Sequence, residues 1–261
     1  MAHINVKKFF KGTYLGLLLA FLYAPIGVMI VLSFNGSKSR AKWGGFSLRW
    51  YEKLASRGEI LDALQLTLEI AVIATIVATV LGTLAAIGIH AMKRRPASLM
   101  MNLSYLPMTT PDIVTGVSLM LMFVFVKIPL GFWTMLMAHI AFDTPYVLFS
   151  VMPKLRQMNV NLYEAALDLG CTPLKAVRKV IMPQIMPGVV TGALLAFTMS
   201  LDDFVISYFT SVTDKNLSMV IYSAARKGLE PSIYALSTIM FVVVLALLLI
   251  INKRASLENV A

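Results

Sequence analysis

The sequence has little cysteine, histidine or charge. Its one cysteine, Cys171, excludes a disulfide within the chain and cannot by itself form a thiolate metal site. The three histidines, His3, His90 and His139, are isolated and show no metal-ligand spacing. The chain has no GxxxxGK(S/T) motif, so it is not expected to hold the phosphates of ATP. We therefore expect this chain to bind no metal and no cofactor.

Charged residues make up only 14% of the 261 residues, whereas hydrophobic residues make up 58%. The mean hydropathy is +0.78, which is higher than a soluble fold needs. Several runs of about 20 residues carry few or no charges, and a helix of that length crosses about 30 Å of hydrocarbon. The sequence therefore predicts an all-α, polytopic membrane protein.

The net charge of +10 comes from lysines and arginines that lie mostly between the apolar runs. This scattering is typical of residues that anchor and orient membrane helices in lipid, and it offers no compact surface for nucleic acid. The first apolar run follows Lys7, Lys8 and Lys11 and is too long for the core of a signal peptide. We interpret it as an uncleaved membrane anchor.

We expect six membrane spans within a single transmembrane domain of residues 1–261. Their approximate bounds are 13–34, 63–89, 99–126, 132–151, 185–209 and 233–251. An even number of spans places both termini on one side, and the distribution of lysine and arginine slightly favours the cytoplasmic side. A long polar segment, 152–184, separates the fourth span from the fifth.

This polar segment has more helix signals than a simple connection needs. Asn161 is predicted to cap a first helix, and Glu164 lies in its early turn. Gly170 is predicted to end that helix, because glycine readily adopts left-handed backbone angles. Two short helices exposed on the cytoplasmic side are therefore expected in 152–184.

The second of these helices is predicted to begin at Pro173. Apolar residues follow helical spacing from Leu174 to Ile181, while lysine and arginine occupy the other face. Pro183 and Pro187 are predicted to end the helix before the fifth span, because proline removes a backbone donor.

The segment also carries a recognisable pattern: Glu164-Ala165-Ala166, then Gly170, and later Val180-Ile181-Met182-Pro183. It resembles the EAA signature of the permeases of bacterial ATP-binding cassette (ABC) importers. The resemblance implies the type I (MetI-like) permease fold and makes the first helix a coupling helix that docks on a cytoplasmic ATPase. Ala165 and Ala166 would allow close approach, and Glu164 would pair with a basic residue of that partner.

Further motifs extend the resemblance over nearly the whole chain, to permeases of the spermidine/putrescine (PotC) type. They are Tyr23-Ala24-Pro25, Ser33-Phe34-Asn35, Trp50-Tyr51, Thr110-Pro111-Asp112-Ile113, Leu130-Gly131-Phe132-Trp133 and Ser200-Leu201-Asp202-Asp203. The resemblance implies a transport subunit of the bacterial inner membrane rather than an enzyme. It also implies a second permease, two copies of an ATPase that binds ATP and magnesium, and an extracytoplasmic polyamine-binding protein.

Four aspartates fall within the predicted spans, where an unpaired carboxylate is costly: Asp112, Asp143, Asp202 and Asp203. Lysine and arginine are missing from the spans except at an edge, so a cationic solute or water is expected to satisfy these carboxylates. Asp202 and Asp203 lie about 100° apart on a helix, so we expect at most one of them to face a pathway while the other bonds locally. Tyr23, in the first span, is a further candidate through a cation–π contact.

The third span contains a second signal next to one of these acids. Pro107 and Pro111, with Thr109 and Thr110 between them, free backbone carbonyl oxygens just before Asp112. A broken helix beside an acid predicts a cation site. The alternative is a proline kink whose carbonyl groups are satisfied by the threonine hydroxyls.

Two other functions remain open from the residues alone. An importer of this class could carry ferric ion, thiamine or another amine. An intramembrane aspartyl protease would need two carboxylates such as Asp112 and Asp203 on separate helices. However, the Tyr-Asp and Gly-x-Gly-Asp contexts of those proteases are missing, and a protease would leave the EAA pattern unexplained.

Overall fold

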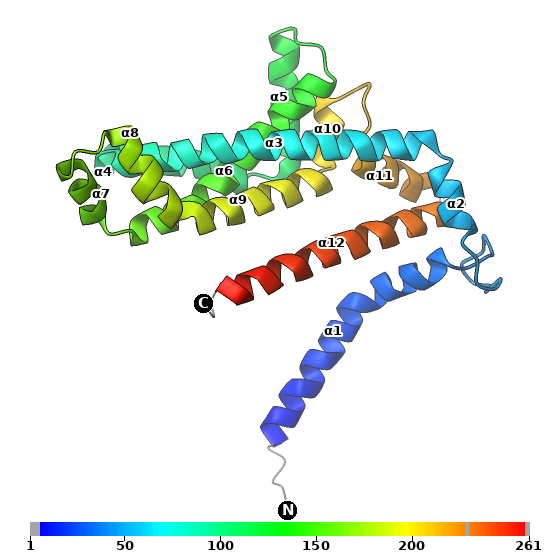
Figure 1. The fold of residues 1–261 in the computed structure, drawn as a ribbon. Helices are drawn as coiled ribbons and strands as arrows, with labels where there is room; N and C mark the ends of the chain where they lie inside the picture. The colour runs from blue at the N-terminus through cyan, green and yellow to red at the C-terminus, as the bar shows by residue number, and fades with distance from the viewer. Residues whose placement is uncertain (1–5, 228–229, 259–261) are drawn as a thin grey trace, which may run out of the picture. The chain divides into compact units, whose positions relative to one another are not determined.

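The computed structural model describes residues 6–227 and 230–258, and these residues are helical nearly throughout (Figure 1). The chain forms two compact units, one of residues 1–61 with 221–261 and the other of residues 62–220. The elements, in order, are α1 (Val6–Ser33), α2 (Arg49–Ala55), α3 (Gly58–Ala91), α4 (Arg94–Thr109), α5 (Asp112–Phe125), α6 (Phe132–Gln157), α7 (Val160–Asp168), α8 (Pro173–Ala176), the π-helix η1 (Val177–Ile181), α9 (Met182–Asp202), α10 (Val205–Thr210), α11 (Leu217–Lys227) and α12 (Pro231–Glu258).

Within the described residues, four helical stretches are long and apolar enough to cross a membrane: Gly12–Ser33, Gly58–Ala91, Phe132–Gln157 and Pro173–Asp202. Counting α4 and α5 together as one broken span raises the number to five, and Pro231–Ala246 is a shorter apolar helix. The all-α membrane fold is thus confirmed, whereas the number of six spans stays a prediction.

Two predicted spans are not the straight helices that their bounds imply. The third, 99–126, is broken between α4 and α5, which are bent by 105°. Pro111 lacks an amide donor and keeps Thr110 out of the helical region, so Thr110 is extended at φ −79° and ψ 142°. In the fifth, 185–209, the helical stretch begins at Pro173 and ends at Asp202, and the short α10 (Val205–Thr210) follows.

Helix α6 lies at the centre of the unit formed by residues 62–220. It packs on α9 where two glycines remove side-chain bulk: a Cβ added to Gly188 would lie 2.8 Å from the Ser150 carbonyl oxygen, and one added to Gly192 would lie 2.9 Å from Val147 Cα. Gly82 of α3 is equally close to α6, since its added Cβ would lie 2.7 Å from Val147 Cβ. These close approaches let the backbones of α3, α6 and α9 pack tightly.

Apolar clusters continue this core along α6. One joins α3, α6, η1 and α9, a second joins α3 to the start of α6, and a third joins α5, α6 and α10. Their buried members are Ala86, Ile89, Val147, Leu148, Val151, Met152, Leu155, Ile181, Ile185 and Ala196; Ile70, Ala74, Met135 and Leu136; and Phe123, Ala138, Phe142 and Ile206.

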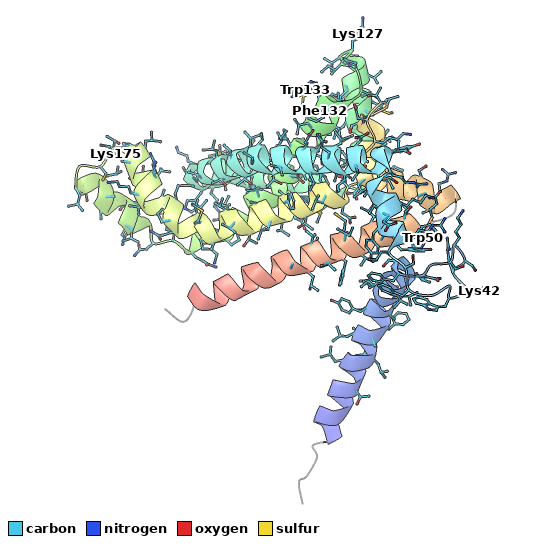
Figure 2. All side chains as sticks on the ribbon, turned by 45° about the vertical axis from the view of Figure 1, so that its right-hand side comes forward. Lys42, Trp50, Lys127, Phe132, Trp133 and Lys175 are labelled. Carbon is cyan, nitrogen blue, oxygen red and sulfur yellow. The ribbon has the colours of Figure 1, made fainter. Side chains whose placement is uncertain are left out.

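The other unit is organised by the residues that follow α1. The side-chain amide nitrogen of Asn35 donates to the carbonyl oxygens of Ser39 and Lys42, and its oxygen accepts from the amides of Ser37 and Gly44. Trp50 of α2 donates its indole N–H to the Asn35 carbonyl oxygen and is 1% exposed (Figure 2). The loop between α1 and α2 is therefore an ordered structure rather than a flexible connection.

Ion pairs join α2 and the residues just after it to Glu230, which precedes α12 in this unit. Glu230 lies 3.6 Å from Lys53 Nζ and forms a closer pair with the Arg57 guanidinium. The hydrogen bond from Arg57 is the largest influence on Glu230 and holds the pKa of that carboxyl below its usual value.

Candidate functional site

Helix α7 carries the EAA pattern. The side-chain oxygen of Asn159 accepts a hydrogen bond of 3.1 Å from the backbone amide of Asn161 and caps this helix. The prediction that Asn161 is the cap is therefore wrong by two residues. Asn159 has the extended backbone that a cap requires, with φ −76° and ψ 112°, whereas Asn161 already lies inside the helix.

The predicted end of α7 at Gly170 is confirmed. Gly170 has φ +83°, and its amide donates to the Leu167 carbonyl oxygen at 2.9 Å while the Cys171 amide donates to the Ala166 carbonyl oxygen at 3.0 Å. This pair of bonds is the Schellman motif, which needs a left-handed residue at this position. Gly170 thus fixes the direction in which the chain leaves α7.

The surface of α7 has two faces. Ala166 is 9% exposed, and Tyr163 packs against the apolar cluster of α6, η1 and α9. Glu164 and Ala165 are exposed. Of the two small residues expected to admit a partner, only Ala165 is available, because Ala166 contacts its own chain.

The predicted end of the second helix at Pro183 and Pro187 is wrong. Helix α8 continues through the π-helical turn of η1 into α9, where Pro183 occupies the first turn and Pro187 lies inside the helix. A proline ring would clash with the carbonyl four residues before it in a regular α-helix, and the wider π-helical turn before Pro183 relieves that clash. The EAA loop is therefore joined rigidly to the span that ends at Asp202.

The break between α4 and α5 leaves Asp112 at the first position of α5, where its side chain is exposed. The carbonyl oxygens freed at the break are partly satisfied by threonines. Thr109 Oγ1 donates to the Leu106 carbonyl oxygen at 3.1 Å, and Thr110 Oγ1 lies 3.2 Å from the carbonyl oxygens of both Leu106 and Pro107. The predicted broken helix is confirmed, and the threonine bonds of the alternative interpretation are also present.

Asp202 and Asp203 have different environments at the end of α9. Asp202 is exposed. The Asp203 carboxylate accepts hydrogen bonds from the amides of Ile206 at 3.1 Å and Ser207 at 2.7 Å and from Ser207 Oγ at 2.8 Å, so it caps α10. The expectation that one of the two acids bonds locally is confirmed, and that acid is Asp203.

A buried histidine joins these elements, and sequence reasoning missed it. His139 of α6 is 2% exposed; its Nδ1 lies 2.6 Å from Ser200 Oγ, and its Nε2 lies 2.9 Å from Ser207 Oγ and 3.4 Å from Asp203 Oδ2. Asn216 extends the network by donating to the Asp203 carbonyl oxygen at 2.9 Å. A histidine inside an apolar run was the available signal, but its partners come from distant parts of the chain.

Asp143, one turn after His139, is completely buried. Neither of its carboxylate oxygens has a hydrogen-bond partner among the described residues. Tyr146 is close enough to Asp112 and Asp143 to interact electrostatically with both of them. Asp143 is likewise close enough to interact with Asp203. The structure therefore brings the acids of α5, α6 and the α9–α10 break into one region.

The last predicted pathway residue, Tyr23, belongs to α1 in the unit of residues 1–61 and 221–261. Its side chain is 56% exposed. Its role in solute binding stays a prediction.

Chains of solved ABC transporters have a fold similar to that of this chain. A chain of a bacterial ABC transporter involved in the import of the acidic polysaccharide alginate superposes with a TM-score of 0.75 over 98% of both chains, at 11% identity. The MetNI methionine transporter gives a TM-score of 0.62 over 75% of this chain and 94% of its own, at 18% identity. At such low identity these likenesses show the fold alone.

Curated relatives are more similar in sequence. The spermidine/putrescine transport system permease protein PotC of Haemophilus influenzae is 38% identical over 94% of this chain and 95% of its own length. The Escherichia coli K12 protein of the same name is 36% identical over 94% and 93%, and the putrescine permease PotI of that strain is 39% identical over 84% and 81%.

A family match agrees with these relatives. Residues 78–254 match the family described as binding-protein-dependent transport system inner membrane component. The match includes the EAA loop and all four acids of the candidate pathway. The chain belongs to the inner-membrane components of binding-protein-dependent ABC transport systems, and it is a transport subunit rather than an enzyme.

Proposed function

We propose that this chain forms half of the translocation pathway of an ABC importer for polyamines. The relatives that resemble it over most of their length are named as permeases for spermidine and putrescine. In the proposed assembly it pairs with a second permease and works with two copies of a cytoplasmic ATPase, which bind ATP and magnesium. An extracytoplasmic polyamine-binding protein supplies the solute, and both termini of this chain lie in the cytoplasm.

The observation that carries this proposal is the arrangement of acids at helix breaks. Asp112 and Asp202 are exposed, and each lies beside a break in an otherwise apolar span. An exposed carboxylate can accept hydrogen bonds from an ammonium group, and these are stronger than bonds between neutral groups. A linear polyamine carries several ammonium groups on apolar stems, so it suits carboxylates that are spaced along a path.

The remaining acids have supporting roles in this proposal. Asp203 is held by the α10 amides and by His139, so it adds negative charge at a fixed position. Asp143 is buried and its carboxylate has no partner among the described residues. It would bind an ammonium group of the solute after a movement of α6, α9 or α10 opens access to it. Tyr23 is proposed to add a cation–π contact with the solute.

We further propose that α7 receives the movement of the ATPase. Its outward face carries Glu164 and Ala165 beside the exposed Leu162, and a second exposed acid, Asp168, lies one turn after Glu164. The face therefore offers acids next to a small and an apolar residue. Because α8, η1 and α9 are continuous, a displacement of the loop would reach the end of α9 at Asp202.

The test of the cargo is uptake of labelled spermidine into vesicles that contain the complete transporter. Asp112→Asn and Asp202→Asn should each reduce uptake at least tenfold, because they remove a charge while preserving side-chain size. Asp62→Asn is the matched control, since it makes the same change at an exposed acid to which no role is assigned. Competition by putrescine, thiamine and ferric ion identifies the solute. Failure of both polyamines to enter or compete would contradict the proposal.

The test of coupling is Glu164→Lys, which reverses the charge of the side chain at position 164 on the outward face of α7. It should abolish uptake and the stimulation of ATP hydrolysis by solute while the chain still inserts into the membrane. Normal uptake by this variant would show that α7 does not dock through Glu164.

A further inference from the structure

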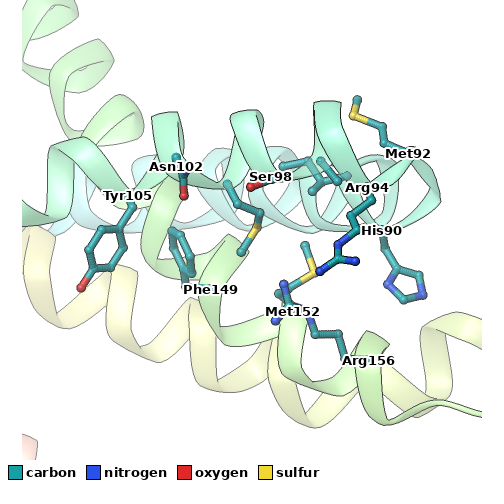
Figure 3. Close-up of a pocket in the computed structure, with 12 residues that line it drawn as sticks. His90, Met92, Arg94, Ser98, Asn102, Tyr105, Phe149, Met152 and Arg156 are labelled. Carbon is teal, nitrogen blue, oxygen red and sulfur yellow. The ribbon is translucent and has the colours of Figure 1, made fainter.

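The unit of residues 62–220 contains a pocket that the proposed transport path does not use. It lies between the end of α3, the face of α4 that runs from Arg94 to Tyr105 and the last turns of α6, and its volume is about 510 Å³ (Figure 3). Its lining residues are Ile89, His90, Met92, Arg94, Ala97, Ser98, Met101, Asn102, Tyr105, Phe149, Met152 and Arg156. Since α6 leads directly into α7, the pocket lies at the end of the helices that carries the EAA loop.

The charge of this pocket is entirely positive. Arg94 and Arg156 come from different helices, and Figure 3 shows their side chains extending toward the same part of the pocket. His90 also lines it, and none of the lining residues is acidic. A polyamine would be repelled here, so the pocket does not belong to a polyamine path. Two arginines at one place favour an anion with several oxygens, because each guanidinium can donate two parallel hydrogen bonds.

The N-terminus of α4 adds a second source of positive charge next to the pocket arginines, and this also favours an anion. The N-terminus of a helix carries partial positive charge and favours acids, yet the first turn of α4 has no acid and begins with Arg94 and Arg95. The N-cap residue, Lys93, makes no capping hydrogen bond with its side chain. A phosphate group bound in the pocket would compensate both the helix terminus and Arg94, which lines the pocket.

An apolar groove continues from the charged pocket. It has a volume of about 380 Å³ and shares Met101, Phe149, Met152 and Arg156 with the pocket, while Pro153 is one of its further lining residues. A free phosphate ion would leave this groove empty. A phospholipid would fill both parts, with its phosphate at the arginines and an acyl chain along the methionines and Phe149.

We propose that this pocket binds one anionic phospholipid from the leaflet on the side of the EAA loop. The lipid bridges α4 and α6 through Arg94 and Arg156, and it thereby holds α4, which ends at the Thr110 break, against the centre of the unit. Lipid occupancy would therefore influence the position of Asp112 without touching the solute. This inference depends on the membrane location of the chain, and it holds whichever cation is transported.

The test uses the transporter purified from membranes through a tag on this chain, with its accompanying subunits. Native mass spectrometry measures retention of phosphatidylglycerol and, for comparison, of zwitterionic phosphatidylcholine. The double variant Arg94→Gln/Arg156→Gln should lose at least tenfold in bound phosphatidylglycerol. The matched control Arg95→Gln/Lys154→Gln removes the same charge from exposed residues outside the pocket and should retain it.

Three results would overturn the proposal. Equal retention of phosphatidylglycerol by the double variant and its control would show that general charge, and not the pocket, holds the lipid. Equal retention of phosphatidylcholine and phosphatidylglycerol by the unchanged chain would remove the anionic specificity. The third result has two parts: millimolar inorganic phosphate displaces phosphatidylglycerol, and Met152→Ser in the groove leaves the retention of phosphatidylglycerol unchanged. Together they would identify a site for free phosphate instead of a lipid. A failure of spermidine uptake alone would leave this lipid measurement unaffected.

Discussion

Substitution of Asp143 by asparagine is expected to raise the stability of the chain and to lower its transport activity. The carboxylate is completely buried, and neither of its oxygens has a partner among the described residues. A buried polar group without a partner costs about 1–3 kcal/mol, and the cost is larger for a charged group. Asparagine preserves the size of the side chain, and its amide also lacks a partner, but it removes the additional cost of burying a charge. Asp143→Asn should therefore increase the free energy of unfolding by about 1 kcal/mol.

The same substitution should reduce uptake. If Asp143 receives an ammonium group when the helices move, the neutral amide removes its charge partner, and we expect labelled spermidine uptake to fall at least fivefold. A residue that lowers stability yet supports activity is typical of a functional site. The two expected effects therefore have opposite signs.

Thermal unfolding in detergent and uptake in vesicles are the two measurements. An increase of 1 kcal/mol corresponds to about 2–4 °C in a chain of this size. The control, Asp62→Asn, should change neither quantity. Unchanged uptake by Asp143→Asn would refute the role in the pathway. A lower unfolding temperature would refute the reasoning about stability, because it would mean that the carboxylate already has a favourable partner.

Three further predictions concern the positions that hold the fold around the pathway. Gly82→Ala should lower thermal stability by about 1–3 kcal/mol, because the added Cβ would lie 2.8 Å from the Thr144 carbonyl oxygen, whereas Gly88→Ala on the same helix meets nothing within 4 Å. Gly170→Val should strain the left-handed turn by about 1–2 kcal/mol and reduce uptake while leaving membrane insertion intact. His139→Phe should cost about 1–3 kcal/mol for each buried group left without a hydrogen bond and should impair uptake.

Each of these has a result that would contradict it. Equal stability of the Gly82 and Gly88 variants would show that α3 does not approach α6 as closely as described. Normal uptake by Gly170→Val would mean that the direction of the chain after α7 does not matter for coupling. For His139, rescue of both stability and uptake by His139→Gln would support a positioning role through hydrogen bonds. Unchanged thermal stability of His139→Phe would show that the hydrogen bonds of His139 do not stabilise the fold.

Several features follow from local sequence, and the structure confirms them. Apolar runs of about 20 residues predict membrane helices because their length matches the hydrocarbon thickness. The end of α7 at Gly170 follows from the conformational freedom of glycine, and the break before Asp112 follows from Pro111. These predictions succeed because each depends on residues within a few positions along the chain.

Local reasoning failed where two local signals competed. Asn159 and Asn161 are both suitable caps, and the pattern does not distinguish them, although the structure uses Asn159. Pro183 is a strong signal for a helix end, yet the π-helical turn of η1 lets the helix continue. In each case the backbone geometry of the folded chain decided between the alternatives.

The sequence by itself determined that this is a helical membrane protein with acids inside its apolar spans and an EAA loop between them. Only the tertiary structure decided which acids are exposed, which is bonded to His139 and which has no partner. Hydrophobic length and backbone conformation are local properties of the chain. The environment of a carboxylate depends on side chains from α5, α6, α9 and α10, and these come together only when the helices pack.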